Sequence, residues 1–220
     1  MELTRFLISL VVARQSLSVD VPPFFVMDLS KPPAHRWEGA LEKILERHPY
    51  EYSFQPVFEN HAPLFRSLTD GQKRSIASAV RKHYPETADE LQGIAAQFAA
   101  INHGDVNFEY LVLWLYFHEL AHTPAGADVH TRECTGIVAE SAIGDIFHGG
   151  NMDQSPPAAR NLTLRVRFVD GAGRTVFDGV DWYTLLSTGV SRAVKRGVAT
   201  VQENWRSTTV RALDDVISDI

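Results

Sequence analysis

Hydrophobic positions recur with two different periods along this chain, and the change falls after residue 126. Before that point apolar residues recur at helical spacing, as at Leu41, Ile44 and Leu45. The helices that this pattern predicts span 37–47, 67–83, 87–101 and 107–122. A Pro-rich stretch over 19–37 precedes them and is predicted to be extended. The last helix is the most apolar of the four, which predicts that it is buried.

After residue 126 the apolar positions alternate, which is typical of strands. Two strands are predicted over 135–140 and 145–148, joined around Gly144. The alternation continues over 162–168, and a turn at 170–173 returns the chain through 175–180 as a hairpin. Residues 187–200 and 208–220 have the pattern of helices. Helices followed by strands predict the α+β class.

The third predicted helix carries a start signal of its own. Thr87 and Glu90 stand three residues apart, which is the spacing of a capping box. In that arrangement the hydroxyl accepts an early amide hydrogen and the carboxylate returns the bond to the backbone. The pair therefore predicts that the helix begins at Thr87.

Composition and charge are those of an ordinary folded protein and exclude some partners. The chain has 220 residues, of which 45% are hydrophobic, enough to bury a core as one large or two small units. Its formal net charge is −6 without clustered Lys and Arg, so no nucleic-acid partner is expected. It has no run of 18 apolar residues, so no membrane span is expected.

Cys134 is the only cysteine of the chain, and it stands at the start of the first predicted strand pair. Asp153 follows the second strand of that pair. A lone thiol facing a carboxylate across a strand pair has the pattern of a catalytic nucleophile. The alternative is that Cys134 is a small buried hydrophobic residue, which is the commoner role of a single cysteine.

Two blocks of sequence support the catalytic alternative. Residues 134–140 read CTGIVAE and residues 148–153 read HGGNMD. In order and spacing they resemble the acid ceramidase and N-acylethanolamine acid amidase family, in which such a cysteine becomes the N-terminus of the catalytic chain. Further similar stretches are Pro22-Pro23, Pro32-Pro33, Arg36-Trp37, 90–96, 107–110, 162–168 and 175–177.

The resemblance implies a proenzyme with an αββα sandwich of the N-terminal-nucleophile hydrolase type. Residues 19–133 would be a mostly helical pro-segment, and residues 134–220 the start of the catalytic domain. Cleavage between Glu133 and Cys134 would free an α-amine, whose ordinary pKa of about 7.7–8.0 lets it take the thiol proton. In this family the residue matching Asp153 orients that amine, and His148, Gly150 and Asn151 would lie near the site.

The resemblance also implies a substrate, partners and a compartment. The substrate would be an N-acylated lipid, either a ceramide or an N-acylethanolamine, hydrolysed without a cofactor. The pro-segment would stay attached after cleavage and help to form the acyl pocket, and the enzyme would contact a membrane surface or a lipid-presenting protein. The family implies a lysosomal or secretory location, and a cytoplasmic one is the alternative. Residues 1–18 have the short apolar stretch of a signal peptide, or else form a buried first strand or helix.

Two departures from the family pattern favour a catalytically inactive relative as a further alternative. Gly150 stands where the family has an arginine. Because the chain ends at Ile220, the sandwich is expected to be incomplete and to lack the downstream Asn and Arg that the family uses for the oxyanion. Loss of one such donor costs about 10²–10³ in rate. The hairpin over 162–180 is then expected to leave an apolar sheet edge exposed.

A second motif predicts a different chemistry. His118 and His122 stand one helical turn apart with Glu119 between them, as in zinc peptidases in which the glutamate is the general base. A third ligand would have to come from His130, Glu140 or His148. The alternative is an amphipathic helix whose His and Glu side chains meet solvent at its C-terminal end.

Overall fold

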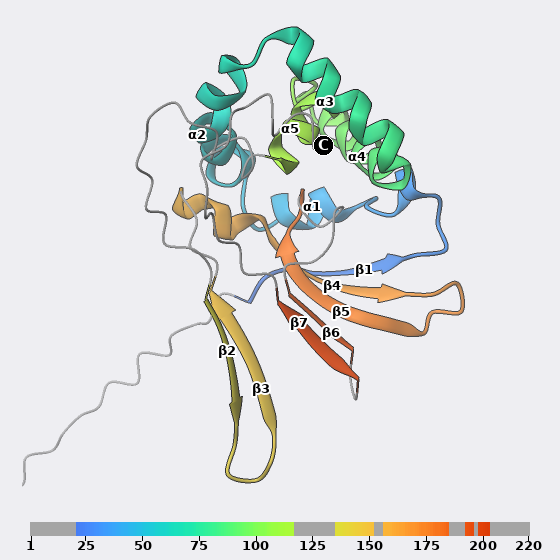
Figure 1. The fold of residues 1–220 in the computed structure, drawn as a ribbon, viewed down its shortest axis with the longest axis vertical. Coiled ribbons are helices and arrows are strands. Elements are labelled where there is room, and N and C mark those ends of the chain that lie inside the picture. Colours follow the sequence, from blue (N-terminus) through green and yellow to red (C-terminus); the bar gives the residue numbers. More distant parts are fainter. Residues whose placement is uncertain (1–20, 117–134, 152–155, 185–191, 196–197, 203–220) are drawn as a thin grey trace, which may run out of the picture.

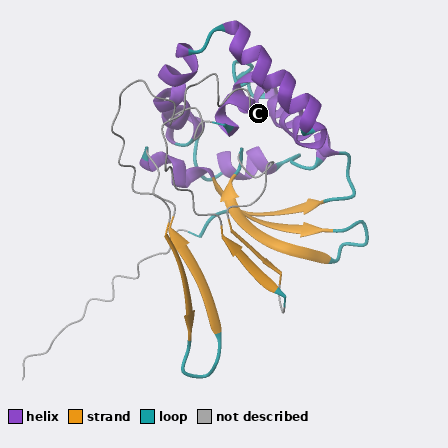
Figure 2. Cartoon of the chain, in the orientation of Figure 1, coloured by secondary structure: helices purple, strands orange, loops and turns teal. Residues whose placement is uncertain are grey.

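The computed structural model describes residues 21–116, 135–151, 156–184, 192–195 and 198–202. The described residues form a layer of helices on one face of a five-stranded sheet, and a separate two-stranded hairpin extends away from both (Figures 1 and 2). This arrangement confirms the α+β class. That the strands are the first part of an incomplete αββα sandwich of the N-terminal-nucleophile hydrolase type stays a prediction.

The helical layer largely follows the predicted pattern. Its α-helices are α1 (Ala40–Leu45), α2 (Phe54–Ser67), α3 (Asp70–His83), α4 (Pro85–Ala100) and α5 (Phe108–Leu115). Short 3₁₀ turns η1 (Pro33–His35), η2 (Tyr50–Tyr52) and η3 (Pro157–Leu162) connect elements. Helix α2 was not predicted from the sequence. Helix α5 is buried, as predicted, for the part that is described. No helix among the described residues is long and apolar enough to cross a membrane.

The predicted capping box at the start of α4 is wrong. The helix begins at Pro85. Proline is favourable in a first turn because the amides there have no acceptor within the helix, so its lack of an N–H costs no hydrogen bond. Thr87 therefore lies inside the helix, and the Glu90 carboxylate turns inward to other partners. A capping box does occur at the start of α3, between Thr69 and Gln72.

The sheet has the strand order β1-β4-β5-β6-β7. Its strands are β1 (Phe24–Asp28), β4 (Thr163–Val169), β5 (Thr175–Trp182), β6 (Arg192–Lys195) and β7 (Ala199–Gln202). Strand β1 pairs with β4 in parallel, and the other neighbours are antiparallel. The hairpin predicted over 162–180 is confirmed as β4 and β5.

Two predictions about the sheet are wrong. The helix expected over 187–200 is replaced in its described part by β6 and β7, because these residues pair with β5 and with each other. The exposed edge expected at the β4–β5 hairpin does not exist there. Strand β4 is covered by β1 on one side, and β5 is covered by β6 on the other.

One hydrophobic core joins the helices to the sheet. Phe25 and Met27 of β1 are buried against it together with Leu164 and Phe168 of β4. The same core includes Trp37, Trp114 and Tyr183, each at most 1% exposed. Residues from both sides of the predicted cleavage point therefore pack in a single core.

Candidate functional site

The candidate site is built on the β2–β3 hairpin, which is the separate pair of strands in Figure 1. Strand β2 (Thr135–Glu140) pairs antiparallel with β3 (Ile146–Asn151), which confirms the predicted strand pair. The turn between them includes Gly144 with a φ of 87°, a left-handed conformation that favours glycine. At the other end of the hairpin, Thr135 is the partner of Asn151.

The predicted nucleophile and its partners flank this open end in the sequence. Cys134 directly precedes β2, and Asp153 is the second residue after β3. Both lie outside the described residues, and so does Glu133. Because Thr135 and Asn151 are directly opposite each other, the chain enters and leaves the hairpin at the same end. The roles of Cys134 and Asp153 stay predictions.

Glycines occupy three positions near the open end of the hairpin. Gly136 of β2 stands opposite Gly150 of β3, and the next pair joins Ile137 to Gly149. A Cβ atom added at Gly149 would meet no atom within 4 Å. At Gly149, therefore, the described residues leave open space beside the strand. Gly150 cannot supply the cation that an arginine would bring to this position.

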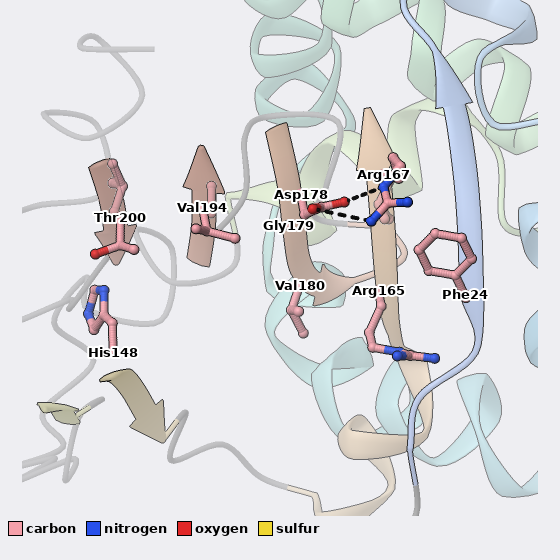
Figure 3. A pocket seen from close by; sticks show the side chains of 12 residues that line it. Phe24, His148, Arg165, Arg167, Asp178, Gly179, Val180, Val194 and Thr200 are labelled. Atoms are coloured by element: carbon pink, nitrogen blue, oxygen red, sulfur yellow. Dashed lines mark hydrogen bonds and ion pairs between the residues drawn. The ribbon is translucent and has the colours of Figure 1, made fainter. Parts of the chain in front are cut away.

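Of the residues predicted to lie around Cys134, His148 has a described side chain. It stands opposite Val138 and is half-buried. Its side chain lines a cavity of about 330 Å³ between the hairpin and the face of the sheet that the helices leave open (Figure 3). Arg165 and Thr200 line the same cavity from β4 and β7.

The structure does not bring together a zinc site from its described residues. His118, Glu119, His122 and His130 lie outside them. Glu140 is opposite Ile146 at the turn end of the hairpin, and His148 lies two residues further along β3, opposite Val138. In the part of the chain that is described, no three His, Cys, Asp or Glu side chains cluster as metal ligands. The zinc alternative stays a prediction, which metal analysis of the wild type and of His118→Ala would test.

Comparison with known proteins gives one informative similarity. No family model matches the chain. The chain is 24% identical over 182 residues to the N-acylethanolamine-hydrolyzing acid amidase of Caenorhabditis elegans. The aligned part is 82% of this chain and 45% of that relative. The aligned part of this chain therefore covers less than half the length of the relative.

A buried polar cluster far along the chain from the hairpin escaped the sequence analysis. Glu90 of α4 accepts a hydrogen bond from Trp37 Nε1 at 2.8 Å and one from Arg36 Nη1 at 2.9 Å. The Arg36 guanidinium also pairs with Glu86 and donates to the carbonyl of Leu29 at 3.1 Å. Burial raises the pKa of Glu90, and its bonds to Trp37 and Arg36 act in the opposite direction. The cluster ties the segment after β1 to α4.

Two arginines on the open face of the sheet were not predicted as part of a site. The alternating pattern predicts only that Arg165 and Arg167 face solvent. Arg167 Nε donates to Asp178 Oδ1 at 2.7 Å, which raises the pKa of the arginine. Their alternation with buried residues was the available signal, but it could not show which element faces them.

Proposed function

We propose that this chain is a cysteine amidohydrolase of the N-terminal-nucleophile type, acting on the amide of an N-acylated lipid. The observation that supports this proposal is the alignment with a relative named for hydrolysis of N-acylethanolamines. Any stretch of 182 residues within this chain includes Cys134. The block that begins at Cys134 is also the part of the sequence with the strongest nucleophile pattern.

The first proposed step is self-cleavage. The thiol of Cys134 attacks the carbonyl carbon of Glu133, and the C–N bond of that peptide breaks as a thioester forms. The thiol proton goes to the departing nitrogen, which becomes the α-amine of Cys134. Water then hydrolyses the thioester, leaving a carboxyl group on Glu133 and a free thiol on Cys134.

The second proposed step is hydrolysis of the substrate amide. The α-amine takes the thiol proton, and the thiolate attacks the acyl carbon. The amine leaving group departs with that proton, and the acyl group remains on sulfur as a thioester. Water releases the fatty acid and restores the thiol. Asp153 would orient the α-amine, and the glycines at 136, 149 and 150 would leave room for the acyl carbon beside the nucleophile.

The name of the relative favours an ethanolamine head group over a sphingoid base. A lysosomal or secretory location and contact with a lipid surface are part of the same proposal. The pro-segment would remain bound after cleavage because its core residues, such as Met27 and Trp37, pack with residues that follow Cys134.

Intact-mass measurement tests the proposal at its first step. The wild-type protein should be cleaved before Cys134 under mildly acidic conditions, whereas Cys134→Ala should stay a single chain. Ser75→Ala, at an exposed position of α3, is the matched control and should be cleaved like the wild type. Equal processing of wild type and Cys134→Ala would overturn the proposal.

Turnover is measured separately with a fluorogenic N-acyl amide. Activity that requires Cys134 supports the complete mechanism. Cleavage without turnover would instead favour the inactive relative, because self-cleavage can proceed without the oxyanion donors that hydrolysis of a substrate needs.

A further inference from the structure

The face of the sheet opposite the helices combines apolar and cationic side chains. Phe24 of β1 is 41% exposed and Val194 of β6 is 37% exposed. Arg165 lies between them in the strand order, directly opposite Val180 of β5. Residues directly opposite in an antiparallel pair share a face, so Arg165 and Val180 point to the same side. This face is the one toward the viewer in Figure 3.

The same face is hollowed where the β2–β3 hairpin passes it. The cavity has a volume of about 330 Å³, which is at the lower end of the range of roughly 300–1,000 Å³ for small-molecule sites. Val180 and Val194 form its floor, and His148 of β3 and Thr200 of β7 close it at the side away from Arg165 (Figure 3). A ligand lying across the strands would therefore meet a cation at one end and the two valines along its length, beside the Arg167–Asp178 ion pair.

Of the two arginines that line the cavity, only Arg167 has a carboxylate partner among the described side chains. Arg167 is paired with Asp178 at 2.7 Å. The Nε of Arg165 donates to the carbonyl of Pro22 at 3.0 Å, and its guanidinium lies 5.7 Å from the centre of the Phe24 ring. Among the described side chains, no carboxylate is paired with Arg165. A ligand with a single negative charge would balance this guanidinium, whereas a neutral head group would not.

We propose that this cavity binds a long-chain carboxylate. The carboxylate lies on the Arg165 guanidinium, which can present two parallel N–H donors to it. The alkyl chain crosses Val180 and Val194 toward Thr200 and His148. Burial of the chain supplies most of the affinity, because Arg165 is exposed and a surface ion pair contributes little. The charge selects the head group. Binding needs no chemistry at Cys134, so it does not depend on the proposed hydrolysis.

Dodecanoate binding to the 220-residue Cys134→Ala chain tests this proposal. Calorimetry below the micellar concentration should give tighter binding for dodecanoate than for dodecanol or dodecyltrimethylammonium. Arg165→Gln should raise the dissociation constant for dodecanoate about fivefold and abolish the preference over dodecanol. Arg174→Gln, at an exposed position in the β4–β5 turn, is the matched control and should bind like the parent protein.

A second variant keeps the test independent of the arginine. Val180→Trp fills the floor of the cavity while leaving Arg165 in place, so it should weaken dodecanoate and dodecanol equally. Circular dichroism identifies any variant that has not folded. The proposal is overturned if dodecanoate does not bind, if dodecanol binds as tightly, or if both Arg165→Gln and Val180→Trp bind like the parent. If a second copy of the chain covered this face in solution, dodecanoate would not bind.

Discussion

Glu90 is a single carboxylate whose two partners come from a distant part of the chain. It is 8% exposed, and it joins Trp37 and Arg36 to α4. Burial raises its pKa above the ordinary value of 4.5, although Trp37 and Arg36 favour the charged form. The native state therefore binds this proton more tightly than the unfolded chain does. Its contribution to stability is fully present below pH 4.5 and is lost as the pH rises through the raised native pKa.

Replacement of Glu90 by glutamine measures this effect, because glutamine is neutral at every pH. We expect the free energy of unfolding of the wild type, relative to Glu90→Gln, to fall as the pH rises from 4.5 toward neutrality. Glu90→Ala should cost about 3 kcal/mol, since it leaves a buried indole N–H without its acceptor. Urea denaturation across the pH range gives the pH dependence of the relative stability and the cost of Glu90→Ala. A relative stability that increases with pH would show that the Arg36 pair outweighs burial.

At the scale of secondary-structure elements, Gly93 sets how closely α4 approaches η1. A Cβ atom at this position would lie 1.9 Å from the backbone oxygen of Ala34, so any side chain forces the two elements apart. We expect Gly93→Ala to destabilise the protein by about 3 kcal/mol. Gly71→Ala in α3 is the control, because its nearest neighbour would be 3.8 Å away and alanine favours the helix. Thermal denaturation that gives both variants the same stability would contradict this account.

The β2–β3 hairpin exposes apolar side chains on both of its faces. Ile137 and Val138 are adjacent and point to opposite faces, yet they are 60% and 67% exposed. Ile146 and Phe147 of β3 are exposed to the same degree, at 62% and 61%. A pair of strands without a third layer is marginally stable in water, and such surfaces favour association.

Hydrogen exchange should separate this hairpin from the sheet. We expect amides of β2 and β3 to exchange with little protection, while those of β4 and β5 exchange slowly because both strands are interior and packed on the core. Mass spectrometry of peptic peptides provides the measurement. Equal protection in β3 and β4 would mean that another layer covers the hairpin in solution.

At the scale of the whole molecule, the sheet combines strands from both sides of the predicted cleavage point. Strand β1 pairs with β4 from Phe24 opposite Arg165 to Asp28 opposite Val169, and these strands lie on opposite sides of residue 134. Both strands bury residues in the one core, as Met27 and Leu164 illustrate. A cut anywhere in 117–134 therefore divides the chain without dividing the core.

Two fragments produced by such a cut should remain together. We expect them to elute as one species in gel filtration after a specific protease site is placed in 124–130 and cleaved. Met27→Asp should separate them at a lower urea concentration, because it puts a charge at a position that is 1% exposed. Val26→Asp, at the adjacent position that is 50% exposed, is the control. Separate elution of the unmutated fragments would show that the shared core is too weak to hold them.

The sequence by itself predicted the elements whose periodic pattern is long or whose turn is distinctive. The helix ending at His83 and the buried helix after Asn107 follow from apolar spacing. The β2–β3 and β4–β5 hairpins follow from alternation around Gly144 and around the turn at 170–173. The family resemblance also came from sequence alone, because it depends on residue order and not on contacts.

Tertiary structure alone decided that β6 and β7 are strands and which partner the Glu90 carboxylate binds. Strands β6 and β7 have four residues each, too few for a period to distinguish strand from helix, and they become strands by pairing with β5 and with each other. Glu90 met the local rule for a helix cap, but Trp37, 53 residues away, supplies its bond instead. A local pattern predicts only interactions within its own element, whereas burial and pairing depend on which distant segments the fold brings into contact.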